Sequence, residues 1–385
     1  MNRDLWLLTL AQGLFMTNNV TFLAINGLVG LSLAPLGWMA TLPVMGYVLG
    51  GALSTGLVAR SQRLWGRRGA FQSGLLVAVA ACLACALAVA LQAFWLLVAA
   101  TVVAGYYSAN AGLYRFAATE LCAPSYKEKA LSLVLAGGLL GAIAGPNLAV
   151  YTRELGHAPF LVAYLVLAAL AALSVPVLRA IRFAPAPPRS AVAGATGRPL
   201  AQIVRQPVFV VAAMGSALGF GIMNLLMTAT PIAMQACGFA FDHAALVIEW
   251  HVIGMFAPGF FTGHLIARFG ARAIMAVGLL LNVACVAVAL AGQDLHHFLI
   301  ALLALGVGWN FLMTGGTTLA LQAWRPEEKD KAQGALNFCV FSVTALSAFS
   351  AGALATTQGW FWINLGALLP MAAIGIGLVW LKRAG

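Results

Sequence analysis

The most regular feature of the chain is a series of apolar segments separated by short stretches that hold most of the charged residues. Each segment is about 20 residues long, which as a helix spans the roughly 30 Å hydrocarbon core of a bilayer. Twelve such segments occur, near residues 5–29, 37–59, 71–91, 94–119, 130–151, 159–181, 207–234, 244–267, 272–292, 296–321, 332–356 and 360–381. The pattern predicts an all-α membrane protein with twelve transmembrane helices, which has the lipid bilayer as its first partner.

Composition supports this prediction and excludes other classes of protein. Of the 385 residues, 62% are hydrophobic and only 8% are charged, whereas a soluble protein keeps far more charge on its surface. The sequence shows no carboxylate pair, no nucleophile beside a base and no phosphate-binding loop, so we do not expect an enzyme. We expect no prosthetic group either.

The net charge of +11 is a signal of topology. With twelve spans, nearly all Lys and Arg residues of the loops fall on one side of the membrane, while Arg153 stands alone on the other. The positive-inside rule then places both termini in the cytoplasm of a bacterial cell, with the chain in the cytoplasmic (inner) membrane. Because the basic residues are spread over short loops, we expect no nucleic acid as a partner.

Two internal echoes indicate that the chain consists of two six-helix pseudo-symmetric halves. PSYKEKA at 124–130 recurs as PEEKDKA at 326–332, and GLVARSQRLWGRR at 56–68 is echoed by GHLIARFGAR at 263–272. Residues 183–205 are rich in Pro, Ala, Gly and Arg, as a flexible linker would be. The predicted domains are therefore residues 1–182, a cytoplasmic linker at 183–205, and residues 206–385.

The loop at 263–272 resembles the signature loop of the major facilitator superfamily, and GAIAGP at 141–146 resembles another of its motifs. The copy at 56–68 departs from the pattern, with an insertion before Gly66 and with Arg60 where the family usually has Asp. The resemblance implies a substrate site near the membrane midplane, between the halves, that opens alternately to either side.

Candidate chemistry is concentrated in the seventh and eighth segments. Met223, Met227 and Met234 share one stripe of a helix, and His251 and Met255 are four residues apart on the next helix. Because these two helices are antiparallel and joined by a short loop, His251 lies level with Met227, about 11 Å below the outer edge. Met255 in the same way lies level with Met223, about 17 Å deep.

Thioether sulfur and imidazole suit a soft monovalent ion such as Cu(I), so Met223, Met227, His251 and Met255 are candidate metal ligands. Met234 and Cys237, at the outer mouth, are accessory candidates. Methionine also packs well between helices without any ligand, and packing is therefore the competing interpretation. Glu249 points to the opposite side of its helix; we predict a partner on a neighbouring helix, with proton coupling as the alternative.

The pair of motifs M-x-x-x-M and H-x-x-x-M in these two spans resembles the copper importers of the CcoA type, which are major facilitator proteins. The resemblance implies copper as the substrate, inward transport, and cytoplasmic copper carriers or oxidase assembly factors as partners. The alternative function is a proton-coupled carrier of small organic solutes or drugs, in which the Met and His residues are packing. A membrane receptor or assembly factor that does not transport is a third hypothesis.

Overall fold

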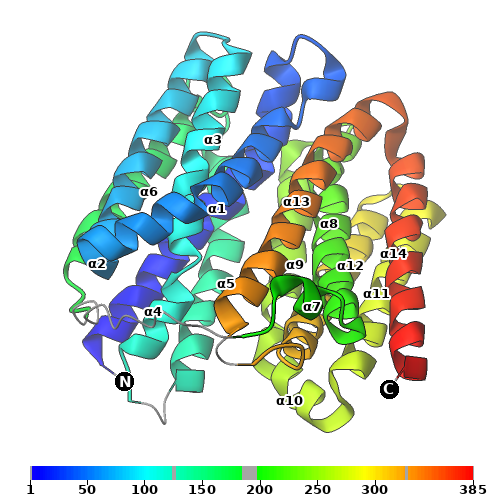
Figure 1. Ribbon diagram of the computed structural model, residues 1–385. Helices are drawn as coiled ribbons and strands as arrows, with labels where there is room; N and C mark the ends of the chain where they lie inside the picture. Colours follow the sequence, from blue (N-terminus) through cyan, green and yellow to red (C-terminus); the bar gives the residue numbers. More distant parts are fainter. Residues whose placement is uncertain (1, 124–126, 184–196, 326–327, 385) are drawn as a thin grey trace. The chain divides into compact units, whose positions relative to one another are not determined.

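The computed structural model of the chain describes residues 2–123, 127–183, 197–325 and 328–384, and within these ranges every regular element is a helix (Figure 1). Most of the predicted linker, residues 184–196, lies outside them. So do parts of the two related heptapeptides, at 124–126 and 326–327.

The helices follow one another with short connections. The first part of the chain forms α1 (Arg3–Leu33), the 3-10 helix η1 (Gly37–Met39), α2 (Leu42–Ala90), α3 (Phe94–Ala111), α4 (Tyr114–Glu120), α5 (Lys127–Thr152) and α6 (Leu161–Arg179). The second part forms α7 (Leu200–Val204), α8 (Pro207–Ala236), α9 (Phe241–Phe256), α10 (Gly259–Phe269), α11 (Ala271–Ala291), α12 (Leu295–Ala320), α13 (Lys329–Thr357) and α14 (Gly359–Ala384).

These helices agree with the twelve predicted spans. In the described ranges nine helices are long and apolar enough to cross a membrane, and α9 with α10 form a further span that is bent by 42°. With 49 residues, α2 is long enough for two crossings, and Gly66 interrupts its helical backbone. The 26-residue α5 completes the set. Each predicted segment therefore coincides with a helix or with one arm of α2.

Contacts divide the chain into two compact units, which are not identical with the predicted halves. The first unit contains residues 1–187 and 231–249, and the second contains residues 188–230 and 250–385. Residues 231–249 are the end of α8 and the start of α9, and they pack with the first unit. The division into halves at residues 182 and 206 stays a prediction.

The two echoed loops have the same local structure in both units. Gly66 and Gly270 both have positive φ, at 65° and 82°, where a side chain would be strained. Two residues later, Arg68 donates to the carbonyls of Arg179 and Ile181 at the end of α6, and Arg272 donates to a carbonyl near the end of α14. Each arginine thereby binds carbonyls that the end of a helix leaves without a partner.

Close helix contacts and buried polar pairs hold the first unit together. α3 approaches α2 so closely that a Cβ on Gly105 would meet the backbone of Gly50 and Gly51, a type of contact that small residues allow between membrane helices. Buried side-chain pairs link other helices, such as Tyr164 Oη donating to Asn26 Oδ1 at 2.8 Å. Such polar pairs satisfy groups that lipid could not satisfy.

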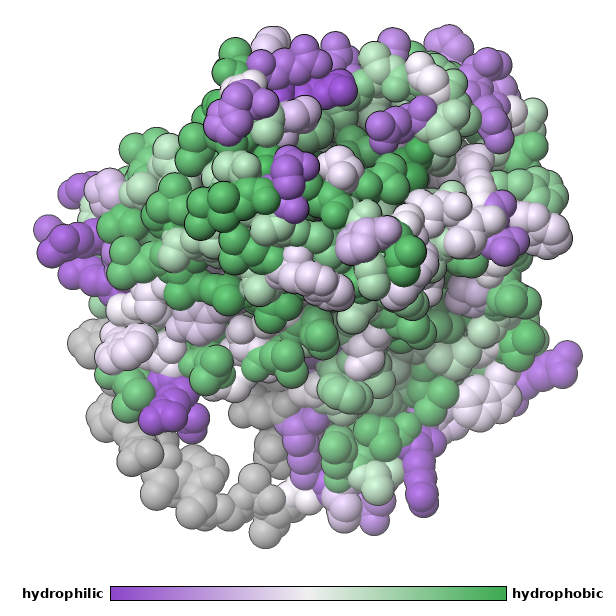
Figure 2. All heavy atoms as spheres, turned by 90° about the horizontal axis from the view of Figure 1, so that it is seen from above, coloured by the Kyte–Doolittle hydropathy of each residue, from purple (hydrophilic) through white to green (hydrophobic). Residues whose placement is uncertain are grey.

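The surface is that of a membrane protein. Large apolar side chains such as Leu53, Phe338 and Leu369 are exposed by 68%, 73% and 77%. Figure 2 shows hydrophobic residues over much of the face that it draws, with hydrophilic residues gathered along the edges. An aqueous surface this apolar would aggregate, whereas hydrocarbon tails solvate it.

A buried ion pair fixes the segment before α7 to the connection between α12 and α13. Arg198 donates through Nε and Nη2 to Glu328 at 3.0 and 2.7 Å, and the Glu328 side chain is fully buried. Lys331 Nζ donates to the carbonyl of Arg198 at 2.5 Å. The described end of the predicted linker is therefore an ordered part of the second unit.

We expect Glu328→Gln to lower the melting temperature of the detergent-solubilised protein by several degrees, since it leaves Arg198 without its counter-charge. The matched control is Glu120→Gln, because Glu120 pairs with Arg67 at 2.6 Å but is 44% exposed. Exposed pairs contribute little to stability, so this control should melt close to the wild type. Equal shifts in the two variants would contradict the assigned role of Glu328.

The same pair predicts how the effect depends on pH. Hydrogen bonds from Arg198 lower the pKa of Glu328 to about 2. A carboxylate with a lowered pKa stabilises the fold above its ordinary pKa of about 4.3, and the contribution is lost as the pH falls through the lowered value. The difference in melting temperature between wild type and Glu328→Gln should therefore be constant between about pH 6 and pH 8.

Candidate functional site

The predicted methionines of α8 are buried side chains on a long apolar helix. Met223 and Met227 are 2% and 8% exposed, and Met234 is fully buried nearer the end of the same helix. Phe220 precedes Met223 by three residues and Met227 by seven, so the three side chains follow one stripe of α8. An aromatic ring and two thioethers thus share one helix face in the second unit.

His251 is fully buried on α9 and has one hydrogen-bonding nitrogen in use. Its Nδ1 lies 2.7 Å from the carbonyl oxygen of Leu302 on α12. A carbonyl oxygen only accepts, so Nδ1 carries the hydrogen, and in the neutral ring Nε2 then holds a lone pair. Nε2 is buried and makes no hydrogen bond. It is therefore a fixed acceptor, or donor of a lone pair, awaiting a partner.

Two small residues hold α9 against α12 at this point. A Cβ on Gly306 would meet the carbonyl oxygen of His251 and the backbone of Gly254 and Met255. Gly254 in turn leaves room for the carbonyl oxygen of Leu303, which a Cβ would meet at 2.9 Å. This close backbone contact is what brings the His251 ring within hydrogen-bonding distance of α12.

The bend between α9 and α10 places Met255 in the last turn before Pro258. The peptide nitrogen of proline carries no hydrogen, so the helical hydrogen-bond ladder is interrupted there. Asn310 of α12 compensates, because its Nδ2 donates to the carbonyl of Met255 at 2.7 Å. Its Oδ1 accepts from Thr262 Oγ1 of α10 at 2.7 Å. Asn310 thereby joins both arms of the bent span to α12.

An aromatic cluster that the sequence analysis did not identify lies beside Asn310. The Trp309 ring packs edge-to-face with Phe220 of α8, with centroids 5.3 Å apart, and with Phe256 of α9 at 6.3 Å. The indole Nε1 of Trp309 is buried and makes no hydrogen bond. Buried tryptophan usually finds a partner for this group, so the cluster offers a donor next to ring surfaces.

The structure separates the predicted ligands from their accessories. Met223, Met227, His251 and Met255 are all buried in the second unit, whereas the accessory candidates belong to the first unit. The accessory candidates are buried Met234, exposed Cys237, and Glu249.

Glu249 accepts a hydrogen bond from Asn147 Nδ2 of α5 at 2.9 Å, in agreement with the expected partner on a neighbouring helix. In the described ranges no group of three or more His, Cys, Asp or Glu side chains could hold a metal ion. Any metal site would therefore depend on thioethers, and the four-ligand metal site stays a prediction.

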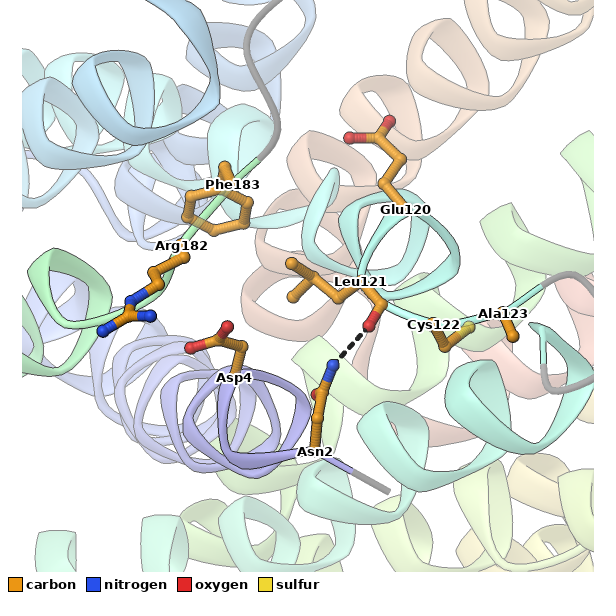
Figure 3. Close-up of a pocket in the computed structure, with 8 residues that line it drawn as sticks. All are labelled: Asn2, Asp4, Glu120, Leu121, Cys122, Ala123, Arg182 and Phe183. Atoms are coloured by element: carbon orange, nitrogen blue, oxygen red, sulfur yellow. Dashed lines mark hydrogen bonds between the residues drawn. The ribbon is translucent and has the colours of Figure 1, made fainter.

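A cavity of about 420 Å³ lies at the N-terminal end of α1 in the first unit. Figure 3 shows Asp4, Glu120 and Arg182 around it, with the Asn2 amide directed at the carbonyl of Leu121, 2.7 Å away. None of the predicted ligands lines this cavity, and Glu120 is already paired with Arg67. Its lining therefore adds nothing to the candidate site in the second unit.

Comparison with known proteins identifies the family. The family model "Major Facilitator Superfamily" matches residues 5–258 and 223–385. The riboflavin transporter RfnT of Brucella anthropi is 40% identical over 94% of this chain and 91% of its own length. The uncharacterized MFS-type transporter YddS of Bacillus subtilis is 28% identical over 82% of this chain and 75% of its own length.

Solved structures agree with the fold alone. The crystal structure of the nucleoside transporter NupG has a TM-score of 0.73 at 12% identity, covering 98% of this chain and 99% of that one. The prediction of an all-α, twelve-helix transporter is confirmed, while the resemblance to CcoA-type copper importers gains no support from these matches. The chain belongs to the Major Facilitator Superfamily and is a multi-pass membrane transport protein, not an enzyme.

Proposed function

We propose that this transporter carries riboflavin into the bacterial cell by alternating access in the cytoplasmic membrane, with both termini in the cytoplasm. The observation that carries the proposal is the 40% identity with a riboflavin transporter over nearly the full length of both chains. This is the organic-solute alternative of the sequence analysis, narrowed to one substrate. It replaces copper import as the leading hypothesis.

The aromatic cluster of the second unit suits the ring system of such a substrate. Riboflavin combines a planar, largely apolar three-ring system with a hydroxylated chain. Ligand sites of this kind are mostly apolar and aromatic, with a few polar groups that set the orientation. Trp309, Phe220 and Phe256 supply ring surfaces 5.3 to 6.3 Å apart, and Trp309 Nε1 supplies an unused donor.

The histidine and the methionines have roles in this proposal as well. The unused Nε2 of His251 can accept a hydrogen bond from the imide N–H of the flavin ring. Thioethers make favourable contacts with aromatic rings and adapt to irregular shapes. Met223, Met227 and Met255 are then a flexible lining for a flat substrate.

Copper import remains a second candidate because of one observation at His251. A metal-binding histidine usually donates its other ring N–H to a carbonyl or carboxylate, which fixes the ring. His251 has this arrangement, with Nδ1 held by Leu302 and a buried Nε2 that makes no hydrogen bond. Neutral thioethers would complete a site for Cu(I).

One experiment separates the two candidates. The chain is produced in a bacterial strain that neither makes nor imports riboflavin, and uptake of radiolabelled riboflavin and of radioactive copper is measured in parallel. We expect riboflavin uptake well above the empty-vector control, competition by unlabelled riboflavin, and no change in copper uptake. Copper uptake that is lost with His251→Ala, together with background riboflavin uptake, would establish the second candidate. Background uptake of both would refute both.

A further inference from the structure

A second cavity of the first unit lies at the ends of α1 and α2 that are remote from the N-terminus. Its volume is about 310 Å³, within the range of small-molecule pockets. The wall includes the connections before α6 and between α8 and α9, and none of the four predicted ligands. Six of the lining residues carry the argument, namely Ser32, Gln92, Arg153, Phe160, Gln235 and Phe241.

One wall of this cavity is a cation stacked with aromatic rings. The guanidinium carbon of Arg153 lies 5.8 Å from the ring centroid of Phe160 and 5.5 Å from that of Phe241. The two phenyl rings pack edge-to-face, with centroids 5.1 Å apart. Arg153 Nε is buried and makes no hydrogen bond. A planar aromatic solute can replace one of these rings against the guanidinium, because both present a π face to it.

The backbone gives an independent indication. Gln92 and Phe160, with φ of 54° and 64°, are the two non-glycine residues with positive φ in the described ranges, and both line this cavity. Such a conformation is unfavourable for a bulky side chain, and strained residues concentrate at binding sites. Local contacts hold them, since Phe160 N donates to the carbonyl of Arg153 at 2.8 Å and Gln92 Nε2 to that of Val89 at 3.0 Å.

We propose that this cavity is an outer vestibule that binds the flavin ring before translocation. The inference rests on the proposed function and adds a second, separate binding site to it. The ring stacks on Phe160 and Phe241, Arg153 Nε donates to a ring carbonyl, and the amides of Gln92 and Gln235 bind the polar edge and the ribityl hydroxyls. Arg153, which stands alone among the basic residues on the predicted outer side, thereby has a specific function.

The test uses protection of cysteines in intact cells. In a Cys237→Ser background, Gln235→Cys is labelled with a membrane-impermeant maleimide, with and without saturating riboflavin. Gln358→Cys is the control, because Gln358 is exposed between α13 and α14, also on the predicted outer side. We expect riboflavin to slow labelling several-fold at Gln235→Cys and not at Gln358→Cys. Ala240→Cys, which also lines the cavity, is a second reporter should Gln235→Cys impair the protein.

Two further variants distinguish binding in the vestibule from an indirect effect of transport. With Trp309→Ala added, protection at Gln235→Cys should persist although uptake falls, whereas Phe241→Ala should abolish it. Normal riboflavin uptake without protection, or protection that disappears with Trp309→Ala, would overturn the vestibule and leave the proposed function intact. Background riboflavin uptake by the wild-type protein would instead refute the proposed function, and the vestibule with it.

Discussion

Replacing Trp309 with alanine is expected to lower the affinity for riboflavin at least about tenfold. Removing an aromatic side chain on which a heterocyclic base stacks costs about 1–3 kcal/mol, and about 1.4 kcal/mol corresponds to a factor of ten. The substitution also removes the one polar group of the Phe220–Trp309–Phe256 cluster, the indole N–H. The measurement is the concentration dependence of riboflavin uptake at matched amounts of protein in the membrane.

Two companion variants make this prediction specific. Trp309→Phe keeps a ring but not the N–H donor and should retain part of the affinity. Trp362→Ala is the control, because Trp362 lies on α14 with 55% exposure and has no place in the cluster. If Trp309→Ala transports riboflavin with wild-type affinity while Trp362→Ala also does, the aromatic cluster is not the binding site.

Gly306→Ala is expected to cause the second large effect, on both stability and transport. The added methyl group would meet the carbonyl oxygen of His251 and the backbone of Gly254 and Met255. Backbone cannot move aside as the end of a side chain can, so α9 must shift away from α12. Overpacking of this kind typically costs about 1–3 kcal/mol, and the shift would lengthen the contact between His251 Nδ1 and Leu302.

The control is another helical glycine of the second unit. Gly366 lies on α14, where an added Cβ meets nothing within 4 Å. Gly366→Ala should therefore preserve the melting temperature of the solubilised protein and its riboflavin uptake, whereas Gly306→Ala should lower both. Identical behaviour of the two variants would show that the close contact of α9 with α12 is unimportant.

The architecture was accessible from the sequence because hydrophobic length is a strong signal in membrane proteins. Apolar segments of the right length correspond to the helices of the structure, and the echoed loops predicted the matching positions of Gly66 and Gly270. Continuity of the helix through the charged loop of α2 was not accessible, because hydropathy marks where apolar stretches end and not where a backbone stops being helical. The packing of residues 231–249 with the first unit depends on tertiary contacts in the same way.

The candidate site was only partly accessible. His251 could be singled out as a buried polar residue, but its partner is the backbone carbonyl of Leu302, which no side-chain pattern reveals. Trp309 was missed because tryptophan in a membrane segment commonly marks an interface, and its neighbours come from two other helices. The spacing of Met and His resembled a copper site, yet these residue types also line apolar pockets, and similarity over the whole chain favours riboflavin.

Residues 231–249 have a consequence for biogenesis. They leave the ribosome some 40 residues after the last helix of the first unit, α6, which ends at Arg179. Until then, the aromatic face of Phe160 has no Phe241 to cover it. Nascent chains arrested before residue 231 should therefore remain sensitive to proteases near Arg153, and resistance should develop only once α9 has been translated and inserted.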